Sequence, residues 1–568
     1  MGMNAYQTIY EALQKIGSGF TLLQPEDVAH GDFATNIAFI LGKEKGISPK
    51  ESAYEISKSL LEELSGIIEK IEVAGPGFIN FFLKDEIRTD EAETVAMSDI
   101  KNVGGKGKVI IEYTDPNPFK LFHIGHIVPN AIGESIARIY EAKGYDVTRV
   151  CYQGDVGMHV AKAIWGMMHL RKDMQPGDFT NYMKSLSENE ANNFMGSVYA
   201  VGSQAFDTNP IAEGEIKELN KKIYEYDISI QSDYKFGKTW SIESFNKMYK
   251  KLGTEFKYFI FESEVADEGV RIVKENIGKV FEESDGAVVF KGEEAGLHTR
   301  VFINSQGLPT YEAKELGNTY KKESLVPGAV QSVVVTAHEI DEYFKVIKVV
   351  LEKIDKPIGD KLLHVSHGML RLPEGKMSSR KGNVIPAEEL IDMVSAKIAA
   401  RLEEMKVNDE DKAKLLNDIA VGAIKFSILK SAPGKDMVFD FDKSLSFEGD
   451  SGPYLQYTHA RLCALLDKAR EAGIDIGSYV IESPERELEQ VIIGYNQVLE
   501  KAYADLGPHH IVQYLLSLTR AFNSMYGRVQ IIGEDKEKSA YYVMLSQAVK
   551  NILAHGLYTL GIVAPERM

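Results

Sequence analysis

The chain has 568 residues, and at roughly 100–200 residues per domain it is too long for one hydrophobic core. Its apolar fraction of 44% and charged fraction of 26% are ordinary for a soluble globular protein, and no apolar run of about 18 residues predicts a membrane span. The net charge of −18 argues against a non-specific nucleic-acid coat, which needs a broadly basic surface. It does not exclude a nucleic-acid enzyme, because local lysines and arginines make such contacts. We expect a cytoplasmic enzyme of three or four domains.

The N-terminal region, about 1–95, predicts an α+β domain. Ser48 followed by Pro49 predicts a helix start, and the stretch 68–84 is β-rich with a turn at Gly75-Pro76-Gly77. Residues 84–107 are polar and predict a linker. The two cysteines, Cys151 and Cys463, lie far apart and predict no structural zinc site.

The middle of the chain, about 106–395, predicts a parallel-sheet α/β core. Residues 108–113 form an apolar run typical of a buried strand, and a polar loop, a helix and a second strand follow it. Further strands are predicted at 331–338 and 362–368, and the polar interval of about 166–300 is interpreted as an insertion. From about 400 to 568, apolar residues recur at three- and four-residue spacing, which predicts an all-α bundle.

A first candidate site is His123-Ile124-Gly125-His126, where the loop after the first core strand enters a helix. Free N–H groups at a helix start favour phosphate, and Gly125 leaves room for a flat base near the backbone. Alone, this tetrapeptide is better explained by a surface loop with incidental histidines.

A second candidate site is the glycine-flanked basic loop from Gly375 to Asn383, which contains Lys376, Met377, Ser378, Arg380 and Lys381. Such a loop could close over a triphosphate and stabilise the charge on departing pyrophosphate. By itself it is more often a solvated basic loop. The two motifs in this order on one parallel sheet favour the catalytic interpretation.

This pair of motifs resembles the two signatures of class I aminoacyl-tRNA synthetases. Residues 112–120 before the first motif and 153–157 after it resemble the arginyl-tRNA synthetase version. So do the stretches 31–39 and 73–82 near the N-terminus, and 451–461, 514–526 and 561–568 near the C-terminus. The resemblance implies a Rossmann-like catalytic core, an α+β N-terminal tRNA-binding domain and an all-α anticodon-binding domain.

The resemblance implies ATP-dependent attachment of arginine to tRNA-Arg through an arginyl-adenylate, with Mg²⁺ accompanying ATP. A monomer is a working expectation that does not come from the resemblance, since the sequence does not give the oligomeric state. The resemblance assigns the ATP phosphates to His123 and His126. It assigns the adenine to Gly125 and to the backbone of His367, Gly368 and Met369. Within the basic loop, Lys376, Arg380 and Lys381 would be catalytic, and Met377 and Ser378 would bind ATP.

For arginine, the resemblance implies binding by Glu112, Asn117, Tyr311 and Glu315, with Glu112 at the guanidinium. A cation with five fixed donors calls for such carboxylates. Otherwise Glu112 would be a solvent-exposed carboxylate at a strand end.

For tRNA, the resemblance implies contacts from Phe78 and Asn80 in the N-terminal domain and from Tyr457, Arg461 and Met568 in the C-terminal domain. Asn80 interrupts an apolar run and is the better candidate of the first pair, since Phe78 is equally well explained as core. Tyr457 and Arg461 share one helix face and could form an ordinary cation–π pair. Met568 could be a frayed end.

Three departures from the family's pattern bear on the site. Position 315 is Glu where Asp is common, and His338-Glu339-Ile340 stands where relatives often have Gln. In the basic loop, Ser379 replaces the second lysine, whose charge could come from Lys120, Arg380 or Lys381.

Three alternatives remain open on the sequence. They are a class I synthetase for another amino acid, a small-molecule nucleotidyltransferase, and a non-catalytic tRNA-binding paralogue. Amino-acid-dependent pyrophosphate exchange separates them.

Overall fold

The structure is a computed structural model that describes residues 4–25, 27–98, 104–371, 385–401 and 409–568. Contacts divide the chain into two compact units. The first unit contains Met1–Lys101, Ser446–Thr559 and Val563–Met568, and the second contains Asn102–Leu445 and Leu560–Ile562. Among the described helices, none is both long and apolar enough to cross a membrane.

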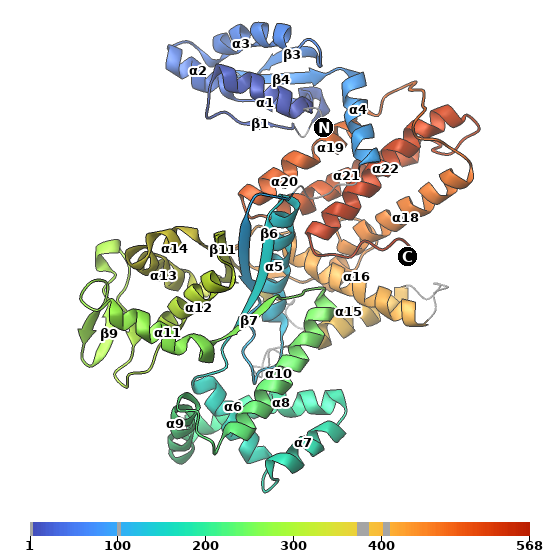
Figure 1. The fold of residues 1–568 in the computed structure, drawn as a ribbon. Coiled ribbons are helices and arrows are strands. Elements are labelled where there is room, and N and C mark those ends of the chain that lie inside the picture. The colour runs from blue at the N-terminus through green and yellow to red at the C-terminus, as the bar shows by residue number, and fades with distance from the viewer. Residues whose placement is uncertain (1–3, 26, 99–103, 372–384, 402–408) are drawn as a thin grey trace. The chain divides into compact units, whose positions relative to one another are not determined.

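The second unit is built on a five-stranded parallel sheet in the order β12-β11-β5-β6-β7 (Figure 1). Strand β5 lies in the middle of the sheet, and its residues are buried from Val109 to Tyr113. The predicted core strands and the helix after the first motif are confirmed. These elements are β5 (Lys108–Tyr113), α5 (Ile124–Ala142), β6 (Asp146–Gln153), β11 (Ala329–Ala337) and β12 (Leu362–His367).

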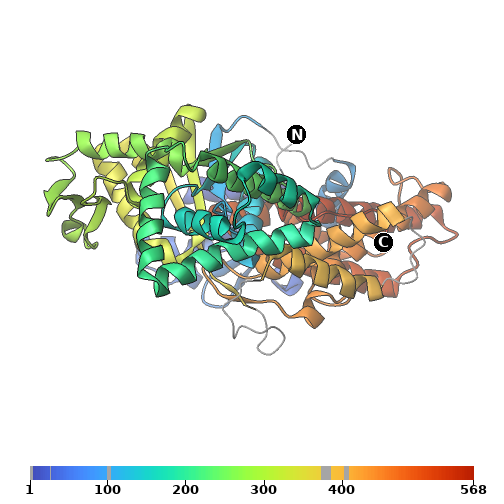
Figure 2. The same cartoon turned by 90° about the horizontal axis from the view of Figure 1, so that it is seen from below.

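The interval predicted as an insertion contributes a strand to this sheet. Strand β7 (Tyr258–Phe261) pairs in parallel with β6, so the interval 166–300 does not lie wholly outside the core, contrary to the prediction. Before it, α6, α8 and α9 pack against one another, and α10 contacts α6 and α7 (Figures 1 and 2). These helices are α6 (Met158–Leu170), α7 (Pro176–Ser185), α8 (Glu188–Thr208), α9 (Pro210–Tyr224) and α10 (Gln231–Leu252).

The remaining elements of the second unit flank the sheet or follow it. Helix α5 packs against β5, β6 and β11, while α13 packs against β12 and α14 against β11. The elements after β7 are α11 (Glu262–Glu275), β8 (Glu282–Ser284), β9 (Ala287–Phe290), β10 (Arg300–Ile303), α12 (Tyr311–Leu325), α13 (Asp341–Ile354), α14 (Lys356–Lys361), β13 (Leu370–Arg371), α15 (Ala387–Arg401), α16 (Asp409–Leu429), β14 (Met437–Val438) and α17 (Phe441–Ser444).

The first unit begins with a four-stranded antiparallel sheet in the order β1-β2-β4-β3, covered by helices. The Ser48 hydroxyl accepts a hydrogen bond from the Glu51 backbone N–H, with Pro49 at the first helical position, as the sequence predicts. The elements are α1 (Ala5–Ile16), β1 (Leu22–Leu23), β2 (Phe33–Thr35), α2 (Ile37–Lys45), α3 (Pro49–Glu63), β3 (Ile68–Ala74) and β4 (Phe78–Leu83).

The segment predicted as a polar linker contains a helix, α4 (Asp85–Met97), so that prediction is wrong. Its buried face consists of Arg88, Thr89, Ala92 and Ala96, which leaves little apolar periodicity to detect. The polar members of that face have partners elsewhere in this unit, and these partners make the burial of the helix possible.

The rest of the first unit, from Ser446 onward, is all-α as predicted. The prediction began the bundle near residue 400, whereas contacts place helices α15 and α16 in the second unit. Helix α21 contacts α18, α19, α20 and α22, and its buried side chains are mostly apolar. The helices are α18 (Gly452–Glu471), α19 (Arg486–Ile493), α20 (Tyr495–Ala504), α21 (His509–Arg528) and α22 (Lys536–Thr559).

Candidate active site

The site lies where the strand order of the parallel sheet reverses. The chain passes from β5 outward to β6 and β7, and then returns to β11 and β12 on the other side of β5. All these strands are parallel, so their carboxyl ends share one edge. His123 follows β5 at this edge, and His367 ends β12. A crevice at such a reversal is where open α/β sheets bind ligands.

The loop between β5 and α5 has an unusual backbone that its neighbours hold in place. Thr114, Asp115 and Phe119 have positive φ of 82°, 42° and 68°, a region that residues other than glycine seldom adopt. The Asp115 carboxylate accepts from the Tyr152 N–H at 2.7 Å, and the Phe119 N–H donates to the Ser241 hydroxyl at 2.8 Å. Such strain, held by surrounding contacts, is typical of functional loops.

The two histidines of the first motif cap helix α5. The Gly125 N–H donates to Nδ1 of His123, and the His123 N–H donates to Nδ1 of His126, both at 3.1 Å. The two rings stack with centroids 3.8 Å apart. A Cβ at position 125 would lie 2.9 Å from the His123 ring, so a side chain there would displace the histidine.

Both histidines are neutral in this environment. Burial, followed by Lys120, lowers the pKa of His123 to about 4. Burial, followed by His123 and Lys120, lowers the pKa of His126 well below its usual value. Because each Nδ1 accepts from a backbone N–H, the proton of each neutral ring belongs on Nε2. The pair therefore offers two Nε2–H donors that carry no charge of their own.

Glu112 and Glu315 share a buried cluster beside this loop. The Glu112 carboxylate accepts from Lys322 Nζ at 2.7 Å and from Asn318 Nδ2 at 3.0 Å. Asn318 Nδ2 also donates to Glu315 at 3.2 Å, and Lys322 Nζ lies 3.8 Å from the Glu315 carboxylate. All four side chains are buried, and Asn318 Oδ1 has no hydrogen-bond partner among the described residues. The structure thus brings the two predicted carboxylates together around one lysine.

Carboxyl groups outnumber cations in this cluster. Burial, followed by the charge of Glu112, raises the pKa of Glu315 to about 8, and the same two causes raise the pKa of Asp115 well above its usual value. A cationic ligand group beside these carboxyls would favour their ionised forms, so the cluster is suited to bind one.

Asn117 lies beside a second buried ion pair. Its Oδ1 accepts from the Gly154 N–H at 3.2 Å. A Cβ at position 154 would lie 2.4 Å from that oxygen and 3.3 Å from Glu262 Oε1, so only glycine fits there. Glu262 is itself buried and paired with Lys314. The contact with Gly154 therefore fixes the orientation of the Asn117 amide.

Several residues of these clusters, among them Glu262, Asn318 and Lys322, were not predicted from the sequence. Asn318 and Lys322 lie three and seven residues after Glu315, a spacing that places all three on one face of a helix. That spacing was a usable signal. Glu262 begins α11, directly after the unpredicted strand β7, so no sequence pattern indicated it.

Tyr311 stands at the start of α12, one turn before Glu315, and is 60% exposed. Lys314 Nζ lies 4.5 Å from the centre of the Tyr311 ring, and the Tyr343 hydroxyl donates to the Tyr311 backbone carbonyl at 3.1 Å.

His338, in the segment that departs from the family's pattern, has Nδ1 3.1 Å from the His367 carbonyl.

The segment His367–Met369 is tightly packed against residues 435–437. A Cβ at Gly368 would lie 2.3 Å from the Lys435 carbonyl, so glycine is required. The Met369 N–H donates to Asp436 at 2.9 Å, and the Met369 carbonyl accepts from the Met437 N–H at 2.8 Å. Those backbone groups of Met369 already have partners, while the residue is 38% exposed.

Residues of the basic loop, namely Lys376, Met377, Ser378, Arg380 and Lys381, lie outside the described residues. Lys120 lies within the described residues, and its Nζ is 4.6 Å from the centre of the Tyr199 ring.

In the first unit, exposure reverses the predicted ranking of Phe78 and Asn80. Phe78 is 43% exposed and packs edge-on against Phe39, whereas Asn80 is only 4% exposed. Asn80 lies in β4, between β2 and β3, and pairs with Ala34 and Glu72. Phe78 is therefore available to a partner and Asn80 is not.

The C-terminal candidates gather on helix α18 of the same unit. The Arg461 guanidinium lies 5.7 Å from the Tyr457 ring centre and 5.0 Å from that of Tyr526, and both tyrosines are exposed. Tyr526, on α21, was not predicted.

The final segment of the chain is docked on α18. Gln456 Nε2 donates to the Val563 carbonyl, and Nδ1 of His459 contacts the Pro565 carbonyl, both at 2.9 Å. Met568 itself is partly buried. The tail therefore ends beside the helix that carries Tyr457 and Arg461.

Family models match three successive parts of the chain. Residues 4–83 match the arginyl tRNA synthetase N terminal domain, residues 93–441 match the tRNA synthetases class I (R) catalytic domain, and residues 455–568 match the DALR anticodon binding domain.

Curated relatives match the chain over nearly its full length. An arginine–tRNA ligase of Fusobacterium nucleatum is 30% identical, with 94% of this chain and 92% of the relative covered. One of Archaeoglobus fulgidus is 29% identical, with 100% of each chain covered. Among solved structures, the arginyl-tRNA synthetase of Thermus thermophilus has the same fold, with a TM-score of 0.82, 23% identity and 99% of each chain covered.

Proposed function

The chain belongs to the arginyl-tRNA synthetase family of class I, and we propose that it attaches arginine to tRNA-Arg in two steps. In the first, the arginine carboxylate attacks the α-phosphate of ATP, which gives arginyl-adenylate and releases pyrophosphate. In the second, the terminal adenosine of the tRNA attacks the adenylate carbonyl and AMP leaves. Catalysis of this kind depends on positioning and on charge stabilisation.

At the ATP end of the site, His123 and His126 donate from Nε2 to phosphate oxygens. The support is their capping geometry, which uses both Nδ1 atoms and selects the tautomer. Gly125 lies under the adenine, and His367, Gly368 and Met369 line its edge. Since two backbone groups of Met369 are already hydrogen-bonded, Met369 contributes its side chain.

At the arginine end, Glu112 and Glu315 bind the guanidinium, while Asn117 and Tyr311 hold the rest of the amino acid. The excess of buried carboxyl groups beside the first motif is the observation that carries this proposal. A guanidinium is a permanent cation with a planar fork of donors, and two carboxylates match that geometry.

The basic loop supplies the positive charge for the departing pyrophosphate, through Lys376, Arg380 and Lys381, with Lys120 as a further cation. Met377 and Ser378 contact ATP. Mg²⁺ enters as a companion of the ATP phosphates rather than as a resident ion. The expected monomeric state and cytoplasmic location stay predictions.

For tRNA, we propose contacts from Phe78 in the N-terminal domain and from Tyr457, Arg461, Tyr526 and Met568 at the anticodon. The exposure of the three aromatic rings supports this choice, and the burial of Asn80 argues against a direct contact there.

The test is pyrophosphate exchange and tRNA charging with each of the amino acids. Arginine alone should support both reactions, and exchange should require tRNA-Arg. Glu112→Gln should raise the KM for arginine far more than that for ATP. Pyrophosphate exchange with another amino acid would show that the enzyme has a different amino-acid specificity. Failure to form an adenylate with any amino acid would support a non-catalytic paralogue.

A further inference from the structure

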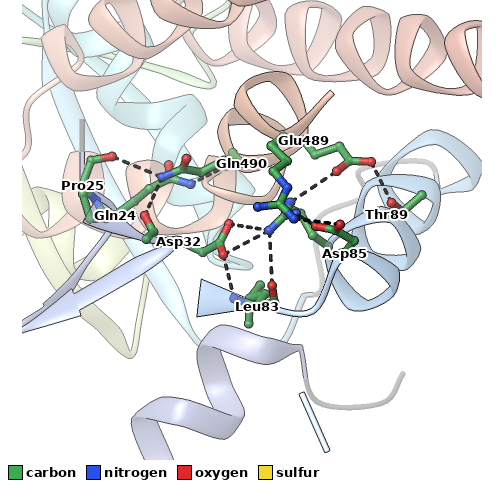
Figure 3. A network of polar contacts seen from close by, with 11 residues as sticks. Gln24, Pro25, Asp32, Leu83, Asp85, Thr89, Glu489 and Gln490 are labelled. Carbon is green, nitrogen blue, oxygen red and sulfur yellow. Dashed lines mark hydrogen bonds and ion pairs between the residues drawn. The ribbon is translucent and has the colours of Figure 1, made fainter. Parts of the chain in front are cut away.

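A buried ion-pair network joins the N-terminal domain to the helical bundle within the first unit (Figure 3). At its centre, Arg88 on α4 is almost fully buried. Its Nη1 donates to both carboxylate oxygens of Asp32, at 3.2 and 3.3 Å, and its Nε donates to Glu489 at 3.3 Å. Its Nη2 contacts Asp85. One guanidinium thus binds carboxylates from the loop before β2, from its own helix and from α19.

Glu489 extends the network into the bundle. It is fully buried, and its second oxygen accepts from the Thr89 hydroxyl at 2.7 Å and from the Tyr541 hydroxyl at 2.8 Å. Its carboxylate therefore ties together α4, α19 and α22.

Further contacts flank the network. Gln490 donates to the Gly31 carbonyl at 2.9 Å, and Asn551 donates to the Val95 and Ala96 carbonyls at 3.1 and 3.0 Å. Ile493 packs into the hydrophobic core of the N-terminal domain. The network is thus the polar centre of a continuous contact.

A buried ion pair is a poor way to gain stability, because desolvation offsets most of the attraction. What it provides is one defined geometry, since a planar guanidinium satisfies several carboxylates only in a fixed orientation. The network is therefore better suited to setting the arrangement of the two domains than to holding them together.

We propose that Arg88 and Glu489 are positioning residues for tRNA binding. They hold the N-terminal surface around Phe78 and the bundle surface around Tyr457 in one arrangement, so that a single tRNA contacts both. The inference rests on the proposed function and adds residues that touch no substrate.

Two variants test it in the full-length chain. Glu489→Gln keeps the shape and an acceptor for Thr89 and Tyr541 but removes the charge facing Arg88. Arg88→Lys keeps the charge but not the planar fork. When two linked contacts can no longer be made together, avidity falls, so the KM for tRNA-Arg should rise roughly tenfold in each. The kcat and the dissociation constants of arginine and ATP should stay unchanged.

Arg486→Gln is the matched control. Arg486 forms an exposed ion pair with Asp85 at 2.9 Å beside the same network, so its loss should leave the KM for tRNA unchanged. A merely structural role would lower the active fraction, and hence kcat, with an unchanged KM for tRNA, and that result overturns the proposal. If Arg88→Lys does not fold, the isosteric Glu489→Gln decides. Failure of the wild-type chain to charge tRNA-Arg would instead contradict the proposed function.

Discussion

Lys322 Nζ lies 2.7 Å from the Glu112 carboxylate, and both side chains are almost fully buried. The pair occupies the position at which the sequence predicts the arginine pocket. An internal lysine there neutralises part of the acidic cluster, so that the carboxyl groups can remain close together in the folded chain.

Removal of that lysine should destabilise the chain. Lys322→Met leaves buried carboxylates without a counter-charge, which typically costs about 3–5 kcal/mol. Denaturant unfolding should show this loss at neutral pH and a smaller loss at acid pH, where the carboxylates are protonated. Lys361→Met, which breaks a partly exposed pair with Glu323, should cost under about 1 kcal/mol. Equal losses in the two variants would contradict this account of the cluster.

Arginine binding should depend on pH through Glu315. Its pKa is raised to about 8, so at neutral pH the free chain holds this carboxyl mostly protonated. A guanidinium needs the carboxylate, so binding releases a proton, and affinity should rise as pH increases toward about 8 and then level off. The raised pKa also affects stability. As pH rises from the ordinary glutamate pKa through about 8, the free energy of unfolding should fall, because the folded chain must keep Glu315 protonated or ionise it in a buried place. Calorimetry in buffers of different ionisation heat measures the released proton, and Glu315→Gln should abolish it.

Local patterns in the sequence were enough to predict the core strands and the first motif, because apolar runs and a loop–helix junction are visible in short windows. Helix α4 was missed because its buried face carries Arg88 and Thr89, whose partner Glu489 lies 401 and 400 residues further along the chain. Asn80 was ranked above Phe78 because it interrupts an apolar run, but β4 is a central strand and Asn80 is only 4% exposed. The burial of helix α4 and of Asn80 depends on pairing between segments that are distant in the sequence, and no local sequence pattern encodes such pairing.

The histidines should act without titrating near neutral pH. His126→Ala removes a donor to a developing charge and should slow adenylate formation by ~10²–10³. Because the pKa of His123 is about 4 and that of His126 is also lowered, the wild-type rate should show no step from these groups near neutral pH. Pre-steady-state measurement of adenylate across the neutral range checks both points. A step near the ordinary histidine pKa that disappears in the variant would show that a charged histidine is used.

Phe78 and Asn80 should respond differently to truncation. Phe78→Ala removes an exposed ring and should raise the KM for tRNA with little change in stability. Asn80→Ala alters a buried position and should change stability more than the KM. Charging kinetics and thermal unfolding of the two variants, measured side by side, separate the roles. The reverse pattern would restore the ranking that the sequence suggested.

The anticodon should be read by Tyr457, Arg461 and Tyr526 with help from the chain's final residues. The Arg461 guanidinium contacts both rings, so an unstacked base can stack on either ring and hydrogen-bond to the cation. Base stacking contributes about 1–3 kcal/mol by alanine substitution, so Tyr457→Ala or Tyr526→Ala should weaken charging of tRNA-Arg by roughly ten- to a hundredfold. Deleting Arg567 and Met568 should have a similar effect, because the preceding residues are docked on α18 and hold the end in place.

The loss of charging activity should be smaller with a tRNA whose anticodon is altered, since the contact with the anticodon is then already missing. Equal losses with both tRNAs would mean that these residues support the bundle rather than read the anticodon.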